Sequence, residues 1–227
     1  MRISPNGRSI VPPVQVKFPF GSTIAIAHRG AHDAQHPENS LAAIEHAIRL
    51  GAAAVEFDVW SLGGGRLEVA HDPPPDSAPG VAVEPFLEAI ARSAVLLNFD
   101  WKGPRDEDRV GLLLASYGLL DRTIVSADDP RPLRVIKQSM PQLTSGLSWE
   151  ADLPPDQVSS LLREAQADAL MLDYHVISPA IATAVRSAGA GLFLWTVTDT
   201  ATFEWLRRFA PDGIATDAIA EQLRATR

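Results

Sequence analysis

Short apolar runs alternate with longer helix-like segments along this chain, and that alternation is the feature that most constrains its fold. The short runs predict nine strands, over residues 23–27, 54–59, 66–70, 95–100, 123–126, 143–148, 169–172, 192–197 and 213–216. Apolar residues recur at helical spacing elsewhere, which predicts eight helices over residues 40–50, 84–93, 106–117, 130–138, 155–165, 179–188, 201–209 and 218–224. Strands that alternate with helices are typical of a parallel sheet with helical crossovers.

The third predicted strand does not fit a parallel sheet, because only WSLGGG separates it from the second. A parallel crossover needs about a dozen residues, whereas a glycine-rich turn suits an antiparallel hairpin. With residues 66–70 folded back as a hairpin return, eight parallel strands remain. We therefore predict an α/β fold, a (β/α)8 TIM barrel over residues 23–227, preceded by an N-terminal arm over residues 1–22. The 227 residues suit one compact barrel of this kind.

The composition narrows the chemistry and the partners. The chain has no cysteine, which excludes disulfides, thiolate metal sites and thiol catalysis. Its formal net charge of -8 gives no sign of the basic surface that nucleic-acid-binding proteins carry, so we expect no nucleic acid as a partner. The first residues contain no apolar leader, and no run approaches the roughly 18 apolar residues of a membrane span. We therefore expect a cytoplasmic protein without stable membrane insertion, and its oligomeric state stays open.

Polar residues with catalytic chemistry stand at the carboxyl ends of the first parallel strands, where barrel enzymes place their active sites. Glu56 and Asp58 share one face of the second strand, and Asp100 and Lys102 share one face of the next, because side chains alternate along a strand. The hairpin then returns the chain to the level of the acidic pair. The positions that we expect to meet are His28, Arg29, Glu56, Asp58, His71, Asp100 and Lys102.

The expected cluster combines acid, base, metal-binding and anion-binding groups. Glu56, Asp58 and Asp100 form an oxygen-rich set suited to a hard divalent cation such as Mg²⁺ or Ca²⁺. Each feature alone has a structural reading: a histidine that ends a strand, a carboxylate paired with a barrel arginine, or an ordinary Asp–Lys ion pair. Their convergence on one end of one barrel favours a catalytic site.

Other polar or aromatic residues receive structural interpretations. Trp195, near the end of the seventh parallel strand, is expected to form a pocket wall. Asp217 is expected to cap the last helix, and Asn39 or Ser40 to cap the helix that follows HPENS. Glu38 is expected to support the site from behind. The histidines expected at the surface or behind the site are His32, His36, His46 and His175.

The ordered series HRG, PENS, VEFDV, VAHD, FDWK, LWTV and DGIATD resembles the glycerophosphodiester phosphodiesterase family, from about residue 24 to the end of the chain. The resemblance implies a TIM barrel that uses a divalent metal to hydrolyse a small-molecule substrate, a glycerophosphodiester. The implied products are an alcohol and glycerol 3-phosphate. The family is related to the sphingomyelinase D-type phospholipases, which share the barrel.

Position by position, the resemblance implies a role for each residue of the expected cluster. His28 and His71 would be the catalytic acid–base pair, and Arg29 and Lys102 would bind the substrate phosphate. Asp100 stands where many family members have glutamate. The sphingomyelinase D-type group has aspartate at this position, as this chain does. The implied ligands of the divalent metal are Glu56, Asp58 and Asp100.

Several alternatives stay open at the level of sequence. Either histidine can be the acid, and the nucleophile is either water or a neighbouring hydroxyl of the substrate. The second nucleophile would give a cyclic phosphate, as in a lysophospholipase D-like phosphodiesterase. A catalytically inactive barrel that binds phosphorylated ligands is the remaining alternative, and it would be expected to lack a histidine or a carboxylate of the cluster.

Overall fold

The computed structural model describes residues 16–74, 80–103 and 105–225. Its strands are β1 (Ile24–Ala27), β2 (Ala54–Ser61), β3 (Leu67–Val69), β4 (Val81–Ala82), β5 (Leu96–Lys102), β6 (Thr123–Ala127), β7 (Thr144–Trp149), β8 (Ala169–Asp173), β9 (Gly191–Val197) and β10 (Gly213–Thr216). Its α-helices are α1 (Leu41–Leu50), α2 (Glu84–Ala91), α3 (Glu107–Ser116), α4 (Pro130–Ser139), α5 (Val158–Ala165), α6 (Pro179–Ser187), α7 (Thr200–Leu206) and α8 (Ile219–Ala225). Short 3₁₀ helices cover Leu120–Arg122, Pro155–Gln157, Tyr174–Val176 and Arg207–Phe209.

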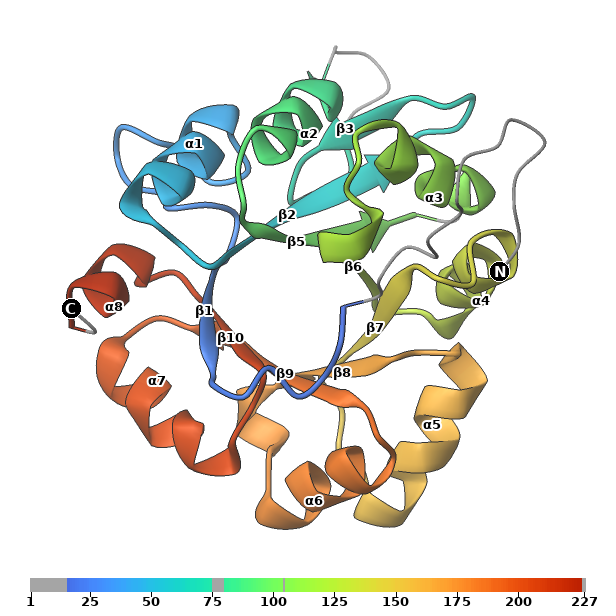
Figure 1. Cartoon of the computed structure of the whole chain (residues 1–227), viewed down its shortest axis with the longest axis vertical. Coiled ribbons are helices and arrows are strands. Elements are labelled where there is room, and N and C mark those ends of the chain that lie inside the picture. Colours follow the sequence, from blue (N-terminus) through green and yellow to red (C-terminus); the bar gives the residue numbers. More distant parts are fainter. Residues whose placement is uncertain (1–15, 75–79, 104, 226–227) are drawn as a thin grey trace, which may run out of the picture.

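A closed parallel barrel lies at the centre of the molecule, with the helices around it (Figure 1). The strand order is β1, β10, β9, β8, β7, β6, β5 and β2, and β2 pairs back with β1. The (β/α)8 prediction is confirmed. β3 lies antiparallel to β2, with Val59 opposite Val69, so the predicted hairpin is also present. β4 extends this hairpin by a short antiparallel pairing that the sequence did not predict.

β2 and β5 each continue two residues beyond their predicted ends. Their parallel register pairs Asp58 with Asp100 and Trp60 with Lys102. Neighbouring strands lie about 4.8 Å apart, so paired residues whose side chains share a face become close neighbours. This register places Asp58 beside Asp100, and the added length of β5 keeps Lys102 on regular backbone.

The ends of the helices follow the local sequence signals. The Ser40 hydroxyl accepts a hydrogen bond from the backbone N–H of Ala43, at 3.1 Å, which confirms a predicted cap of α1. Gly51 ends the same helix in the left-handed conformation, with φ of 85°. Comparable N-caps are formed by Asp129, Ser178 and Asp199.

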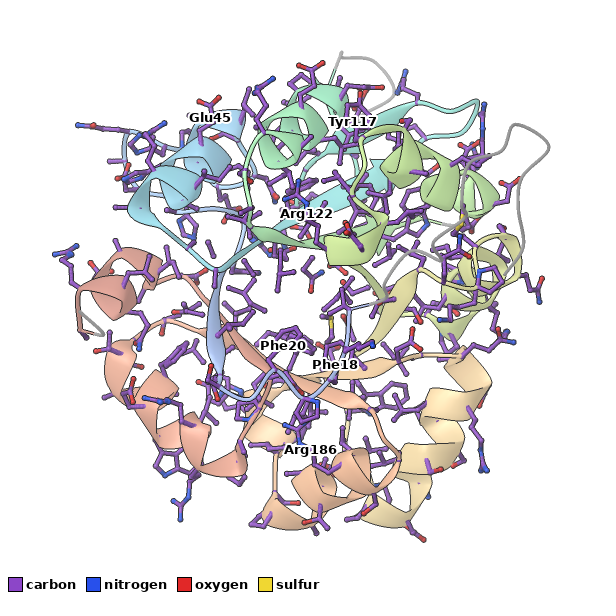
Figure 2. The ribbon with its side chains drawn as sticks, in the orientation of Figure 1. Phe18, Phe20, Glu45, Tyr117, Arg122 and Arg186 are labelled. Atoms are coloured by element: carbon purple, nitrogen blue, oxygen red, sulfur yellow. The ribbon has the colours of Figure 1, made fainter. Side chains whose placement is uncertain are left out.

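Apolar residues form one layer between the strands and the helices and a second, smaller layer inside the barrel. The described part of the N-terminal arm contributes Phe18 and Phe20 to the inner layer, over the middle of the barrel (Figure 2). Their ring centroids lie 5.6 and 5.9 Å from that of Phe193. The backbone N–H of Phe20 donates to Asp212 just before β10, so the arm closes the amino-terminal end of the barrel.

Residues 1–15 of the predicted arm lie outside the described residues. Within the described ranges, no helix has both the length and the apolar character needed to cross a membrane. The barrel mouth opposite the arm is formed by the carboxyl ends of the eight parallel strands, which is where the predicted catalytic residues stand.

Candidate active site

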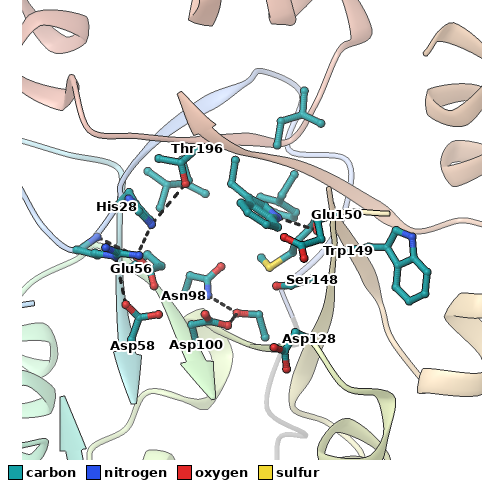
Figure 3. A pocket seen from close by; sticks show the side chains of 18 of the residues that line it. His28, Glu56, Asp58, Asn98, Asp100, Asp128, Ser148, Trp149, Glu150 and Thr196 are labelled. Carbon is teal, nitrogen blue, oxygen red and sulfur yellow. Dashed lines mark hydrogen bonds and ion pairs between the residues drawn. The ribbon is translucent and has the colours of Figure 1, made fainter. Parts of the chain in front are cut away.

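All of the polar residues predicted from the strand ends line one pocket of about 500 Å³ at the barrel mouth. Figure 3 shows His28 together with Glu56, Asp58 and Asp100 on one side of this pocket. Trp195 also lines the pocket, and its indole N–H donates to the backbone oxygen of Met171 at 2.8 Å. The fold therefore brings the expected residues together, and Trp195 forms a fixed wall as expected.

The HRG turn after β1 is a tight turn that packs closely against α1. Arg29 and Gly30 both have positive φ angles, of 55° and 85°. A Cβ atom on Gly30 would lie 2.7 Å from the carbonyl carbon of Ala43, so only glycine fits this contact. The turn directs the backbone N–H of Arg29 to Glu56 Oε2, at 2.8 Å. It thereby ties the end of β1 to the acidic face of β2.

The carboxylates of Glu56 and Asp58, which are buried, and of Asp100, which is partly buried, fit a hard divalent cation. Oxygens of the three side chains lie within 4.8 Å of one another. Burial, then the charges of Asp58 and Asp100, raise the pKa of Glu56 well above its ordinary value. Burial and the charge of Asp100 raise the pKa of Asp58 as well. A dication would offset this repulsion, and an all-oxygen donor set is the one that Mg²⁺ and Ca²⁺ prefer.

Two basic side chains lie against the carboxylates. Lys102 Nζ is 2.6 Å from Asp100 Oδ2 and 3.4 Å from Asp58 Oδ1, and Arg29 Nε is 3.3 Å from Asp58 Oδ2. Burial would lower the pKa of Lys102, but its hydrogen bond to Asp100 and the nearby negative charges raise it above its ordinary value. Lys102 is therefore cationic, and both basic groups line the pocket.

Side-chain amides and hydroxyls orient the carboxylates. Asn39 Nδ2 donates to Asp58 Oδ2 at 2.8 Å, and the backbone N–H of Asp58 donates to Asn39 Oδ1 at 3.1 Å. Asn98 donates to the Ser126 hydroxyl, which donates to Asp100 Oδ1, both at 2.7 Å. The sequence predicted a structural role for Asn39. It did not predict the hydrogen bonds that link Asn98, Ser126 and Asp100. The missed signal was period-two alternation, which places Asn98 on the same face as Asp100.

Asp217 determines which nitrogen of His28 faces the pocket. His28 Nδ1 lies 2.8 Å from Asp217 Oδ1, while Nε2 lies 3.4 Å from Thr196 Oγ1 and 4.0 Å from Glu56 Oε2. An ionised carboxylate can only accept, so Nδ1 carries the proton and Nε2 presents its lone pair. The sequence predicted that Asp217 caps the last helix; the structure turns its carboxylate to His28 and His32 instead.

The charge on Asp217 is maintained by the two imidazoles. Burial would raise the pKa of Asp217, but the hydrogen bonds from His28 and then His32 outweigh burial and lower it below its ordinary value. His32 Nε2 lies 3.2 Å from the same oxygen that accepts from His28. Asp217 is therefore a carboxylate at neutral pH, and His32 lies behind the site as expected.

His71 reaches the pocket from the hairpin but stands at its rim. It follows β3 and lines the pocket with a side chain that is 50% exposed. Its Nδ1 lies 3.2 Å from Asp72 Oδ1, and its backbone oxygen accepts from the Trp60 indole at 3.3 Å. The predicted return to the pocket is present. Among the described residues its ion-pair partner is Asp72, not the acidic pair of β2.

Glu38 supports Arg29 from outside the pocket, as the sequence suggested. Arg29 Nη1 donates to both carboxylate oxygens of Glu38, at 3.1 and 3.2 Å. Arg29 thus lies between Glu38 and Asp58, which limits the positions that its guanidinium can take. His36, His46 and His175 do not line the pocket.

Comparisons with known proteins identify the family of this chain. The model of the glycerophosphoryl diester phosphodiesterase family matches residues 28–102 and 106–221. A glycerophosphodiester phosphodiesterase of Caldanaerobacter subterraneus subsp. tengcongensis is 28% identical over 232 residues, covering 86% of this chain and 94% of the relative. One from Bacillus altitudinis is 26% identical over 158 residues, covering 53% and 64%.

Solved structures share the fold. A glycerophosphodiester phosphodiesterase from Parabacteroides distasonis superposes with a TM-score of 0.74 at 22% identity, covering 90% of this chain and 98% of that one. A phosphodiesterase from Oleispira antarctica, in complex with its product sn-glycerol-3-phosphate, superposes with a TM-score of 0.73 at 19% identity, covering 91% and 97%. The barrel of this chain is therefore the barrel found in these enzymes.

Proposed function

This chain belongs to the glycerophosphoryl diester phosphodiesterase family and is a phosphoric diester hydrolase, and we propose that it hydrolyses glycerophosphodiesters by metal-assisted His28/His71 catalysis. The proposed products are an alcohol and glycerol 3-phosphate. The observation that carries the proposal is the meeting of three carboxylates, two of them buried, with two cationic side chains and an oriented imidazole in one pocket.

Glu56, Asp58 and Asp100 are the residues that would hold the divalent cation. A bound Mg²⁺ or Ca²⁺ supplies Lewis-acid polarisation of a phosphoryl oxygen. Three carboxylates and two cationic side chains leave the ionised site with one excess negative charge, which a dication reverses. This local reversal matters because the whole chain has a formal net charge of -8 and would otherwise repel an anionic substrate.

Arg29 and Lys102 bind the phosphate of the substrate in this proposal. Both line the pocket beside the carboxylate cluster. Hydrogen bonds from charged donors to phosphate oxygens are roughly twice as strong as neutral ones, and they strengthen as charge develops on those oxygens. Glu38 and Asp100 hold the two basic groups in place before the substrate arrives.

His28 is the base and His71 the acid in the proposed first step. Because Asp217 keeps the proton on Nδ1, His28 Nε2 is the nitrogen that can take a proton from the nucleophile, either water or a substrate hydroxyl. His71 stands at the open rim, where the departing alcohol leaves, and gives a proton to its oxygen. General acid–base transfer of this kind contributes about 10²–10⁴-fold to rate.

We expect the purified chain to hydrolyse glycerophosphocholine with Mg²⁺ or Ca²⁺ and to lose this activity in EDTA. His28→Ala should reduce kcat by about 10²–10⁴-fold while leaving the thermal unfolding transition in place. Phosphorus NMR of the products tests the nucleophile, because attack by water gives glycerol phosphate whereas an internal hydroxyl gives a cyclic phosphate.

Three results would contradict the proposal. Full activity in EDTA would show that the reaction does not need a divalent cation. A near-wild-type kcat in His28→Ala would show that His28 is not the base. Absence of turnover with every divalent metal would instead favour the inactive barrel, although both histidines and all three carboxylates of the cluster are present here.

A further inference from the structure

We propose that Asp33, His36 and His46 form a second metal site, outside the barrel mouth, for a late first-row dication of the Zn²⁺ type. Asp33 and His36 lie in the segment between β1 and α1, and His46 lies on α1. Candidate ligand atoms of the three side chains lie within 4.8 Å of one another. None of the three lines the active-site pocket, so this cluster is separate from the proposed catalytic centre.

Hydrogen bonds orient both imidazoles. His46 Nδ1 lies 3.0 Å from the backbone oxygen of Ala31, and His36 Nδ1 lies 2.9 Å from Asp33 Oδ1. A carbonyl oxygen can only accept, so His46 Nδ1 carries the proton and His46 Nε2 keeps a lone pair for a cation, whereas His36 would bind through Nδ1, the nitrogen that faces Asp33. Metal-binding histidines characteristically donate their second ring N–H to a carbonyl or a carboxylate, as His46 does to Ala31.

The two imidazoles are held next to each other rather than dispersed over the surface. Their ring centroids are 4.2 Å apart and their planes meet at 29°. Both side chains are only partly exposed, and in the described part of the chain no donor hydrogen-bonds to His46 Nε2. Two neighbouring imidazoles are a pair that Zn²⁺, Cu²⁺ and Ni²⁺ bind more readily than Mg²⁺ or Ca²⁺ do.

Asp33 supplies the carboxylate of the site. Its Oδ1 accepts from the backbone N–H groups of Gln35 and His36, at 2.7 and 2.9 Å, and from the His36 ring. Because Asp33 Oδ1 already lies 2.9 Å from His36 Nδ1, a cation that displaces the ring proton would be held between this nitrogen and the carboxylate. Asp33 and His46 also line a surface cavity of about 460 Å³, which gives a hydrated cation access. Three protein ligands would leave a coordination position for water.

A metal bound here would connect the loop to α1. The same loop carries Glu38 and Asn39, which contact Arg29 and Asp58 at the mouth. Anything that binds the folded chain and not the unfolded chain stabilises it by mass action. We therefore expect Zn²⁺ to raise the thermal unfolding temperature of the protein through this site.

The test uses the full chain without an affinity tag, so that no added histidines compete. Zn²⁺ affinity is measured by titration calorimetry, and one equivalent of Cu²⁺ is used as a spectroscopic probe by pulsed EPR. We expect hyperfine coupling to two imidazole nitrogens in the unaltered chain. His36→Gln and His46→Gln should each remove one nitrogen and weaken Zn²⁺ binding by more than about tenfold.

His175→Gln is the matched control. His175 Nδ1 also pairs with a nearby carboxylate, Asp173 Oδ1 at 2.7 Å. Among the described residues, however, His175 belongs to no cluster of potential metal ligands. This variant should bind Zn²⁺ as the unaltered chain does. His36→Gln should also keep its Mg²⁺-supported hydrolysis, which separates this site from the proposed function.

Equal Zn²⁺ affinity in the unaltered chain and in His36→Gln, or a Cu²⁺ spectrum with fewer than two nitrogens, would overturn the proposal. The Zn²⁺ affinity of His46→Gln is interpreted only if this variant, without metal, unfolds at the same temperature as the unaltered chain. If it does not, the result for His36→Gln alone tests the proposal.

Discussion

The orientation of a single imidazole depends on a carboxylate 189 positions away in the chain. Asp217 fixes the proton on His28 Nδ1 and directs Nε2 into the pocket, without lining the pocket itself. We infer that it is a positioning residue, which acts on the proposed reaction through His28. The same geometry gives Asp217 a consequence for stability, because both imidazoles that contact it lower its pKa.

Asp217→Asn should reduce kcat by at least about tenfold with a smaller change in KM, because an amide no longer fixes one tautomer of His28. The pH profile of kcat should shift as well, which a purely structural role would not produce. Asp173→Asn is the control, since Asp173 contacts the exposed His175 outside the pocket. An Asp217→Asn enzyme with the kcat and pH profile of the unaltered chain would refute the positioning role.

The stabilising contribution of Asp217 should depend on pH in one direction. Its folded pKa is lowered, so the unfolded chain takes up the proton first as the pH falls. The contribution is therefore complete above the unfolded pKa of about 3.9 and is lost as the pH falls through the folded pKa. Urea unfolding of the unaltered chain and of Asp217→Asn should show a difference at pH 7 that shrinks below about pH 4. A constant difference between these pH values would contradict the assignment.

At the scale of elements, the join between β1 and α1 controls the mouth of the barrel. Gly30 lets the chain turn while touching the backbone of Ala43 on α1. The turn then places Arg29 against Glu56, and the rest of the segment places Asn39 against Asp58. Close packing of this turn against α1 thus orients the carboxylates of Glu56 and Asp58 on β2.

Gly30→Ala should destabilise the protein by about 2 kcal/mol or more, because it combines a positive φ with overlap on Ala43 backbone atoms. Gly51→Ala isolates the first effect, since Gly51 has the same φ of 85° but no atom within 4 Å of the added Cβ. Chemical denaturation should therefore show a larger loss for Gly30→Ala. Equal losses would mean that the Ala43 contact adds nothing.

At the scale of the whole molecule, the barrel is closed at one end by the arm and open at the other for the substrate. Phe18 and Phe20 pack on Phe193 inside the barrel, while the pocket lies at the carboxyl ends of the same strands. Gly191 permits this closure, because a Cβ there would lie 2.8 Å from the Phe18 ring. Stability and chemistry are therefore concentrated at opposite ends, as is usual for this architecture.

Phe18→Ala should lower the free energy of unfolding by about 1–3 kcal/mol, less than a fully buried phenylalanine because Phe18 is only partly buried. The KM of the remaining folded enzyme should be unchanged, since the substitution is at the far end from the pocket. Leu112→Ala provides the control, because Leu112 is 67% exposed on α3. Comparable unfolding curves for the two variants would show that the arm does not contribute to the barrel.

The barrel and most of its site could be predicted because their signals are local. Alternating periodicities defined the strands and helices, the WSLGGG spacing required a hairpin, and parallel strands bring their carboxyl ends to one mouth. Glu56, Asp58, Asp100 and Lys102 could be placed together because side chains alternate along a strand.

The partners of these residues were decided only by the tertiary structure. The Asp217 contact with His28, the Asn98–Ser126–Asp100 chain and the stacking of His36 on His46 join side chains from different elements. Period and spacing specify the face from which a side chain leaves its own element. Which donor or acceptor it then meets depends on how neighbouring elements pack, and that is a property of the closed barrel as a whole.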